Sequence, residues 1–215
     1  VLQILLEACL ESAEDRETPG QLWALREVRS IICSYLHQVF ISEPSLAKLV
    51  HFQGYPRELL PVTVKGIPSM HICLDFIPEL LSQPSLEKQV FAVDLVSHLA
   101  LHYALPKSMS VARLAINTLS TLVTVLSSEN RAELFVPSLP ALVRICEAFP
   151  PLVEDVVSLL TQVGKVCLAE ACSHSHCSPA NLTNWPVAAD HVLVGHIQRT
   201  FVSILRQAIL KVKVY

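Results

Sequence analysis

The stretch from Gly66 to Ala104 constrains the fold most, because it predicts two helices joined by the turn Ser82-Gln83-Pro84-Ser85. Apolar residues recur at helical spacing in both arms: Met70, Cys73, Leu74, Ile77, Leu80 and Leu81 in the first, and Val90, Phe91, Leu95, Val96, Leu99 and Tyr103 in the second. Pro84 suits the first turn of the second helix, where its missing N–H removes no hydrogen bond, and Pro78 predicts a kink in the first. Such a hairpin has two apolar faces and one partner, so further helices must cover it.

The rest of the chain also has helical rather than strand periodicity. We expect further helices at residues 1–11, 21–41, 45–52, 58–64, 108–128, 129–136, 137–149, 150–171 and 188–210, and a loop at 173–187. The segments EPSLAKLV and QPSLEKQV recur after about 40 residues, close to the roughly 40–47-residue period of HEAT and armadillo repeats. The prediction is an all-α fold, an irregular HEAT/armadillo-like α-solenoid of stacked antiparallel helix pairs, with residues 1–215 as a single helical-repeat segment. The apolar run VLQILLEACL at the start, with no initiator Met, indicates a fragment of a larger protein.

Composition argues for helices that are buried on several sides. Hydrophobic residues make up 52% of the 215 residues and charged residues 16%, against averages of about 45–50% and about 25%. A membrane span needs about 20 apolar residues, whereas the longest strongly apolar uncharged segment, Leu114 to Ser128, is shorter and contains Ser and Thr. We therefore expect no membrane segment.

Net charge and cysteine usage narrow the partners and the compartment. The chain has 16 basic and 19 acidic residues, a net charge of −3 and no long run of either sign. Because a non-specific grip on nucleic acid usually needs a basic face, we expect no direct nucleic-acid binding. The seven cysteines mostly occupy apolar helical positions, and without a secretory signal they are expected to be buried and reduced. This indicates the cytosol or the nucleus.

A polar stripe follows the helix expected at residues 108–128, which is otherwise almost wholly apolar. Its members are Ser110, Arg113, Asn117, Thr121, Thr124 and Ser128, with Ser120 and Ser127 beside them. Two interpretations remain open: a face in contact with water, or a face covered by a partner, since a weakly charged surface is a modest indication of an interface. The candidate partner-binding residues are Ser110, Arg113, Asn117, Thr121 and Thr124, with Arg113 as the anchor.

Two groups of side chains have types that bind zinc. Asp94, His98 and His102 recur every four residues on one helix face, but three ligands on one helix still need a fourth group and supporting contacts. We interpret them as an exposed polar stripe opposite Phe91, Leu95 and Leu99. The second group consists of Cys167, Cys172, His174, His176 and Cys177. Structural zinc sites usually use two separated ligand pairs, so we interpret this crowded group as a variable loop after a helix with one buried thiol.

Catalytic motifs do not emerge from the sequence. Five glycines provide no phosphate-binding loop and no nucleophile elbow, and the Ser, His and Asp residues are scattered along the chain. We therefore expect no enzymatic activity, no catalytic or metal site and no cofactor.

Several long segments resemble the C-terminal region of the Integrator complex subunit 2 family. They are SIICSYLHQVFI (30–41), KLVHFQGYPRELLP (48–61), GIPSMHICLDFIPELL (66–81), YALPKSMSVARLAIN (103–117) and ICEAFPPLVEDV (145–156). The similarity covers most of residues 22–166 and rests on long, unusual strings rather than short patterns. Residues 12–20 and 172–187 are less similar to the family.

The resemblance implies a non-catalytic, all-helical scaffold subunit in the nucleus. The Integrator complex associates with RNA polymerase II, attenuates or terminates transcription and processes the 3′ ends of small nuclear RNAs; RNA cleavage belongs to a separate metal-dependent module. The implied partners are other large helical Integrator subunits, with RNA polymerase II contacted only indirectly through the complex. The alternative is a helical-repeat adaptor of a transport or trafficking complex, similar through common solenoid packing alone.

Overall fold

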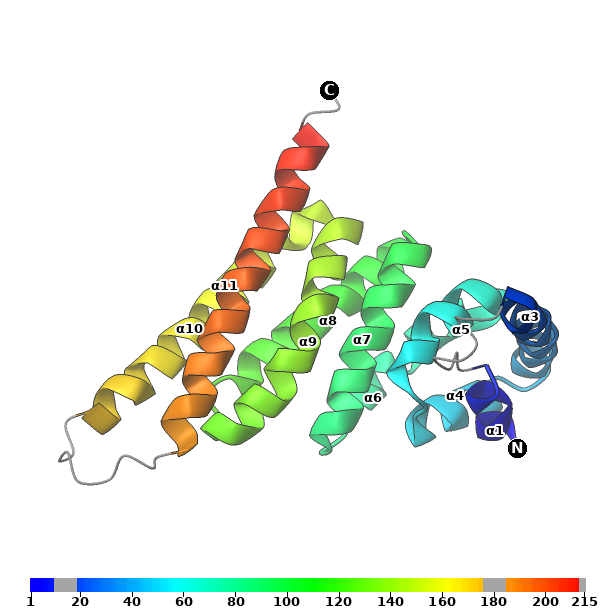
Figure 1. Ribbon diagram of the computed structural model, residues 1–215, viewed down its shortest axis with the longest axis horizontal. Coiled ribbons are helices and arrows are strands. Elements are labelled where there is room, and N and C mark those ends of the chain that lie inside the picture. The colour runs from blue at the N-terminus through cyan, green and yellow to red at the C-terminus, as the bar shows by residue number, and fades with distance from the viewer. Residues whose placement is uncertain (10–18, 176–184, 213–215) are drawn as a thin grey trace. The chain divides into compact units, whose positions relative to one another are not determined.

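The computed structural model describes residues 1–9, 19–175 and 185–212, and the chain divides into two compact units, residues 1–80 and 81–215. All the regular structure in these ranges is helical, and no strand occurs in them (Figure 1). The predicted all-α class is therefore confirmed.

The N-terminal unit is built from short helical pieces around one longer helix. Its elements are α1 (Leu2–Glu7), α3 (Pro19–Ser42), α4 (Pro44–Gln53), the 3₁₀ helix η1 (Arg57–Leu59), α5 (Leu60–Gly66), the 3₁₀ helix η2 (Pro68–Asp75) and α6 (Ile77–Leu81). Helix α3 contacts α1, α4, α5 and η2, and Leu36 and Phe40 on its inner side are almost fully buried. Gly54 ends α4 with a φ of 82°, a conformation that favours glycine.

The first arm of the predicted hairpin is not one kinked helix. Residues 68–75 form the 3₁₀ helix η2, and the chain breaks at Phe76 before α6 begins. The reason lies in Pro78, because a proline cannot donate to the carbonyl four residues earlier and its ring would clash there. The break places Pro78 in the first turn of α6, where neither problem arises. The two arms of the hairpin fall in different compact units.

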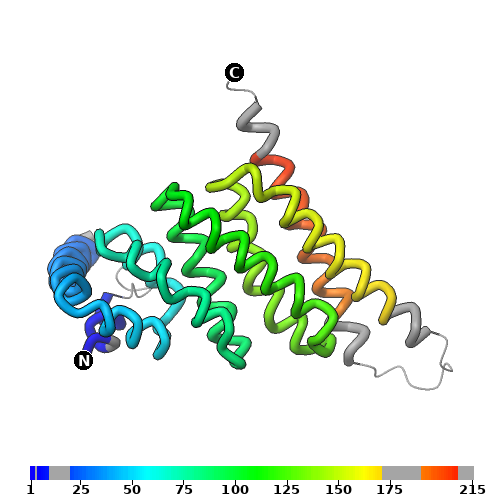
Figure 2. The backbone as a smooth tube through the Cα atoms, turned by 180° about the vertical axis from the view of Figure 1, so that it is seen from behind, coloured from blue at the N-terminus to red at the C-terminus, as the bar shows by residue number. Residues whose placement is uncertain are grey.

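The C-terminal unit consists mainly of long helices. They are α7 (Leu86–His102), α8 (Pro106–Leu122), α9 (Ser128–Ala148), α10 (Val153–Ser175) and α11 (Trp185–Val212), with the 3₁₀ helix η3 (Pro150–Leu152) before α10. Helix α9 packs between α7 and α11, while α8 packs against α7 and α10. Seen from opposite sides, α7, α9 and α11 form one layer and α8 and α10 the other (Figures 1 and 2). The core between them includes Leu95, Leu99, Ile116, Leu134, Phe135, Leu142 and Leu160.

The structure joins the helices predicted at 129–136 and 137–149 into one continuous helix, α9, which contains Pro137 and Pro140. A proline inside a helix costs about 3 kcal/mol or more, because it removes a hydrogen bond and clashes with the preceding turn. The neighbours on both sides of α9 outweigh this cost. Contacts with α7 and α11 bury Leu134, Phe135 and Leu142 almost completely, and such packing overrides local propensity.

Several predicted boundaries also shift. Helix α8 ends at Leu122, not at Ser128. Helix α7 begins at Leu86, because the Ser85 side chain caps it by accepting from the Lys88 amide, so Pro84 lies outside its first turn. The predicted loop at 173–187 is helical at both ends, since α10 reaches Ser175 and α11 starts at Trp185. Residues 176–184 lie outside the described residues. Among the helices that are described, none combines the length and apolarity needed to cross a membrane.

Candidate functional site

The five predicted partner-binding residues all lie at the surface of the C-terminal unit. Ser110, Arg113, Asn117 and Thr121 are exposed on one side of α8, and Thr124 is exposed in the turn that follows the helix. The opposite side of α8 is buried through Val111, Ala112, Ala115, Ile116 and Leu119. The structure therefore gathers the stripe on one outer face. Whether a partner covers that face stays a prediction.

Polar groups of the stripe are bonded within the chain. Arg113 Nε donates to Asp155 Oδ2 of α10 at 3.3 Å, and both side chains are about half exposed. The Ser110 hydroxyl donates to the carbonyl of Pro106, and the Thr121 hydroxyl donates within its own helix. An exposed ion pair of this kind contributes about 0–1 kcal/mol. The anchor cation is thus loosely held and accessible.

Asp94, His98 and His102 do not converge as metal ligands would. The interpretation as an exposed stripe is also wrong, because Asp94 is buried and His98 is only partly exposed. The buried Asp94 carboxylate pairs with the guanidinium of Arg144, whose Nε also donates to the Ser97 hydroxyl at 2.9 Å. His98 Nε2 lies 3.9 Å from Asp94 Oδ1, while His102 is exposed. Over the ranges that the structure describes, no three or more His, Cys, Asp and Glu side chains form a group that could hold a metal ion.

The second candidate metal group is only partly described. Cys167 is buried in α10, where burial and the nearby Asp190 raise the pKa of its thiol to about 11. The thiol is therefore protonated at neutral pH. The structure does not describe the side chains of Cys172 and His174, and His176 and Cys177 lie outside the described residues.

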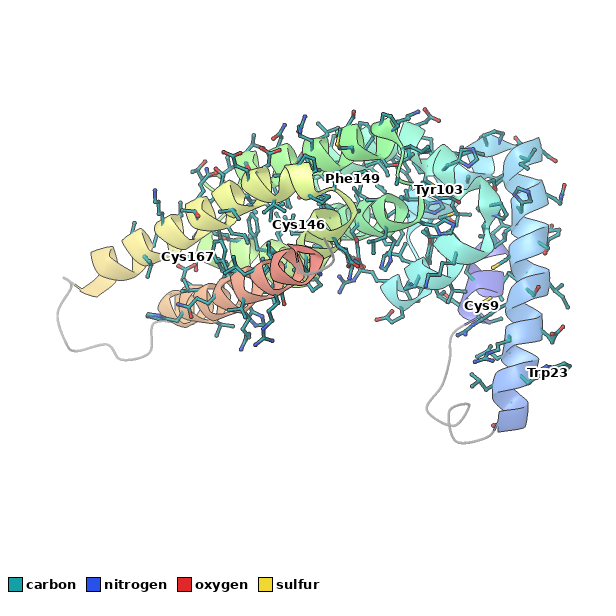
Figure 3. All side chains as sticks on the ribbon, turned by 90° about the horizontal axis from the view of Figure 1, so that it is seen from above. Cys9, Trp23, Tyr103, Cys146, Phe149 and Cys167 are labelled. Atoms are coloured by element: carbon teal, nitrogen blue, oxygen red, sulfur yellow. The ribbon has the colours of Figure 1, made fainter. Side chains whose placement is uncertain are left out.

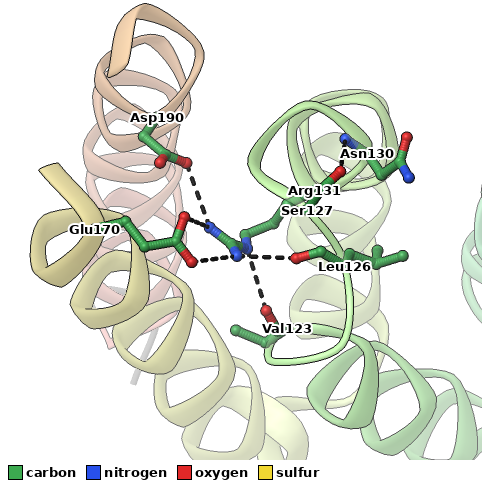
Figure 4. Close-up of polar contacts among 7 residues, drawn as sticks. All are labelled: Val123, Leu126, Ser127, Asn130, Arg131, Glu170 and Asp190. Atoms are coloured by element: carbon green, nitrogen blue, oxygen red, sulfur yellow. Dashed lines mark hydrogen bonds and ion pairs between the residues drawn. The ribbon is translucent and has the colours of Figure 1, made fainter. Parts of the chain in front are cut away.

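Sequence reasoning missed the main polar centre of the C-terminal unit, which surrounds Arg131 of α9 (Figure 4). Only 1% of Arg131 is exposed. Its Nε donates to the Val123 carbonyl at 3.1 Å, and Nη2 donates to the Leu126 carbonyl at 3.0 Å. The guanidinium also forms two hydrogen bonds with the Glu170 carboxylate, at 2.9 and 3.2 Å, and Nη1 reaches Asp190 Oδ1 at 3.4 Å.

The Arg131 centre explains why α8 ends early. The last carbonyls of a helix have no partner within that helix, and here the guanidinium supplies donors to the turn after α8. Its two carboxylate partners come from α10 and α11, so one side chain joins the turn and three helices. The sequence carries only a weak signal of this centre, since a cation near the start of a helix opposes the helix dipole.

The N-terminal unit has a different buried polar group, which we call the His51 cluster: His51, Tyr55, Thr63 and Cys73. His51 Nδ1 lies 2.7 Å from the Ala47 carbonyl, which can only accept, so Nδ1 carries the proton and Nε2 is an acceptor. The Tyr55 hydroxyl lies 3.2 Å from His51 Nε2 and from Thr63 Oγ1. Cys73 Sγ is 3.6 Å from the same Nε2.

Burial keeps the His51 cluster neutral. It lowers the pKa of His51 to about 4, against the effect of the Ala47 hydrogen bond. Burial also raises the pKa of Tyr55 and of Cys73 far above their ordinary values. A neutral imidazole beside a neutral thiol, closed off from solvent, lacks the thiolate that nucleophilic chemistry requires. The cluster joins α4, α5 and η2 and has the properties of a packing element.

The described residues thus define an all-helical protein whose buried polar groups join helices to one another. The family model of Integrator complex subunit 2 matches residues 1–172. Integrator complex subunit 2 of Mus musculus and of Homo sapiens are each 52% identical over 202 residues, which is 81% of this chain and 17% of the relative. The Drosophila melanogaster subunit is 43% identical over 166 residues, 77% of this chain and 15% of its own length. The chain belongs to the Integrator complex subunit 2 family, as the resemblance predicted, and spans about one sixth of these relatives.

Proposed function

We propose that this chain is a non-catalytic scaffold segment of the nuclear Integrator complex. Family membership supports the assignment to that complex. On this proposal, its partners are other large helical Integrator subunits, and it acts with RNA polymerase II only through the assembled complex, in small nuclear RNA 3′-end processing and in transcription attenuation or termination. It binds neither nucleic acid nor membrane directly.

The observation that carries the scaffold role is the layering of α7 to α11. Successive helices alternate between two layers, and α9 contacts its neighbours on both sides. This arrangement supports an α-solenoid of stacked helix pairs, in which each pair contacts only its neighbours and long outer faces stay available to partners. We extend the proposal to residues 1–215 as a single helical-repeat segment.

The exposed stripe on α8 is the proposed partner-binding face. Ser110, Asn117, Thr121 and Thr124 carry hydroxyl or amide groups, which lose water at modest cost when a partner bonds them. Arg113 is the charged member, and its planar guanidinium suits an acidic group of a partner. The weak ion pair with Asp155 leaves Arg113 able to exchange partners.

Immunoprecipitation of the full-length protein from nuclear extract tests the proposed function. Recovery of other Integrator subunits is the expected result. Recovery of vesicle coat or transport factors in their place would instead support the trafficking adaptor.

Charge variants of the α8 stripe sharpen the test. Arg113→Glu is expected to reduce the recovery of Integrator subunits, while the free energy of unfolding changes by no more than about 1 kcal/mol. Adding Asp155→Arg restores an ion pair of reversed polarity, so it is expected to restore stability but not subunit recovery. Lys165→Glu, an exposed change on α10 away from the stripe, is the matched control. Normal recovery with Arg113→Glu would exclude this face as the interface.

A further inference from the structure

A cationic groove lies between α3 and α5 in the N-terminal unit. It has a volume of about 510 Å³. Three cations line it, Arg26 and Arg29 from α3 and Lys65 from the last turn of α5, together with the hydroxyls of Ser30 and Ser34. No carboxylate is among the described residues that line this groove. In a chain whose net charge is −3, such a local excess of positive charge favours an anionic occupant.

The cations are positioned from both walls of the groove. Arg29 Nε donates to the Cys9 carbonyl at 2.9 Å, which fixes this side chain on the α3 wall. Arg26 on the same wall and Lys65 on the opposite wall are both exposed. Two accessible cations that face each other across a groove match carboxylates spaced along one extended or helical segment, because each wall supplies its own partner.

The base of the groove is closed by a close contact between α3 and α5. A Cβ added at Gly66 would lie 2.6 Å from Cys33 Sγ, which is shorter than any normal contact. The two helices therefore meet below the cations without room for a chain to pass between them. An occupant must lie along the surface and be bound from one side.

An exposed aromatic side chain precedes the groove along α3. Trp23 is 66% exposed, and it precedes Ser30 and Ser34 by seven and eleven residues, which puts the three on one side of the helix. Figure 3 shows Trp23 near the N-terminal end of α3. A groove with only three cations, on a helix that also exposes an aromatic ring, fits a peptide better than a phosphate backbone, which needs a longer basic track.

We propose that this groove binds an acidic peptide segment of another polypeptide, whose carboxylates pair with Arg26 and Lys65 and whose apolar side chains pack on Trp23. This surface is distinct from the α8 stripe, and the proposal rests on the scaffold role only in locating the partner within the assembled complex.

Carbodiimide cross-linking of the complex purified with the full-length protein tests the groove. The reagent joins a lysine amine to a carboxylate without a spacer, so a Lys65 cross-link reports a direct Asp or Glu contact. Mass spectrometry is expected to find Lys65 joined to an acidic segment of another polypeptide. Lys65→Arg keeps the charge but removes the amine, so this product must disappear. Lys165, an exposed lysine of α10, is the reference site.

Charge reversal gives a second measurement. The double variant Arg26→Glu with Lys65→Glu is expected to lower the co-purification of the polypeptide that the cross-link identified by about tenfold, without any cross-linking reagent. Its circular dichroism spectrum and melting temperature should not change. Lys165→Glu should have no effect on co-purification. The inference is overturned if Lys65 is joined only to its own polypeptide, or if it forms no cross-link in a complex that still co-purifies. It is also overturned if ribonuclease treatment of the natural complex makes the Lys65 amine newly accessible to chemical acetylation, because RNA would then be the occupant of the groove. Loss of all Integrator subunits from the unmodified protein would instead refute the proposed function.

Discussion

The N-terminal unit, residues 1–80, and the C-terminal unit, residues 81–215, bury polar groups in different ways. The first joins short helices through the His51 cluster, whose members are all neutral near pH 7. The second joins long helices through the charged Arg131 centre, with Glu170 and Asp190 as its anionic partners. Neutral and charged centres fail under different conditions. We therefore expect the N-terminal unit to be sensitive to pH and the C-terminal unit to be sensitive to the loss of a charge.

The largest effect is expected from Arg131→Met, which leaves the buried Asp190 carboxylate without its cation and removes the donors to the turn after α8. Breaking a buried ion pair from one side typically costs about 3–5 kcal/mol. The loss in the free energy of unfolding is measured by urea unfolding, with hydrogen exchange of the amides in residues 81–175 as the readout.

Two variants control the Arg131 experiment. Arg199→Met removes an exposed arginine of α11, so its effect should stay within about 0.5 kcal/mol. Adding Asp190→Asn to Arg131→Met should recover part of the loss, because the uncompensated charge is then gone. A loss below about 1 kcal/mol for Arg131→Met would mean that the centre contributes little to stability.

The His51 cluster gives the second prediction, a pH dependence of the stability of the N-terminal unit that arises from one histidine. The pKa of His51 is about 4 in the folded chain and 6.5 ordinarily, so between these values the unfolded chain binds a proton that the folded chain does not. Above pH 6.5 the protonation of His51 therefore does not affect the free energy of unfolding, and this free energy decreases as the pH falls from 6.5 to 4. The loss is about 3 kcal/mol, at 1.36 kcal/mol per pKa unit.

The His51 prediction is checked by urea unfolding from pH 7.5 to 4, with hydrogen exchange of amides in residues 19–80 as the readout. Carboxylates also titrate in this range, so the comparison is between the natural chain and His51→Gln. The variant should lose the pH-dependent component attributed to His51. Equal slopes for both chains would show that His51 takes up a proton while folded.

The difference between the two units also marks what could be predicted from sequence. Helical periodicity located most of the described helices, because it depends only on neighbouring residues. It missed the continuity of α9 through Pro137 and Pro140, which depends on helices packed beside it. Part of the predicted stripe lies on one face of α8, namely Ser110, Arg113, Asn117 and Thr121, since that requires only regular helix geometry. Thr124 and Ser128 were wrongly placed on the same helix, because α8 ends at Leu122 and Ser128 begins α9.

The buried polar centres could not be predicted in the same way. Arg131 lies in the polar string SENRAEL and resembles a surface residue. Its carboxylate partners lie 39 and 59 residues away, so only the fold brings them together. His51 likewise depends on Thr63 and Cys73 from other elements. Long-range pairing of this kind leaves no periodic signal.

Glycine positions give the third prediction, in which the two units respond with opposite signs. Gly66→Ala places a Cβ 2.6 Å from the buried Cys33 Sγ, and overpacking of this kind costs about 1–3 kcal/mol. Gly164→Ala in α10 meets no atom within 4 Å, so helix propensity alone should stabilise by about 0.5–1 kcal/mol. Thermal unfolding of both variants measures the two signs. Equal effects would show that α3 and α5 can separate without cost.

The smallest effect is expected where the two units are alike, in their exposed ion pairs. Lys48 Nζ lies 2.6 Å from Glu79 Oε2 in the N-terminal unit, and Arg113 pairs with Asp155 in the C-terminal unit, with every side chain between 42% and 54% exposed. Water screens such pairs, and fixing two long side chains costs entropy, so each should contribute about 0–1 kcal/mol. Double-mutant cycles with alanine substitutions measure both coupling energies free of the residues' other contacts.

The two cycles also test where the difference between the units resides. Lys48 Nζ additionally lies 5.3 Å from the centre of the Phe52 ring. The loss of this contact lowers the stability of the single Lys48→Ala variant, but it does not enter the coupling energy with Glu79. If the two coupling energies agree within about 0.5 kcal/mol, the units differ electrostatically only in their interiors. One interior contains the charged Arg131 centre and the other contains the neutral His51 cluster. A coupling energy above about 2 kcal/mol for either pair would show that surface charge also divides the two units, because such a value requires groups that are withdrawn from water.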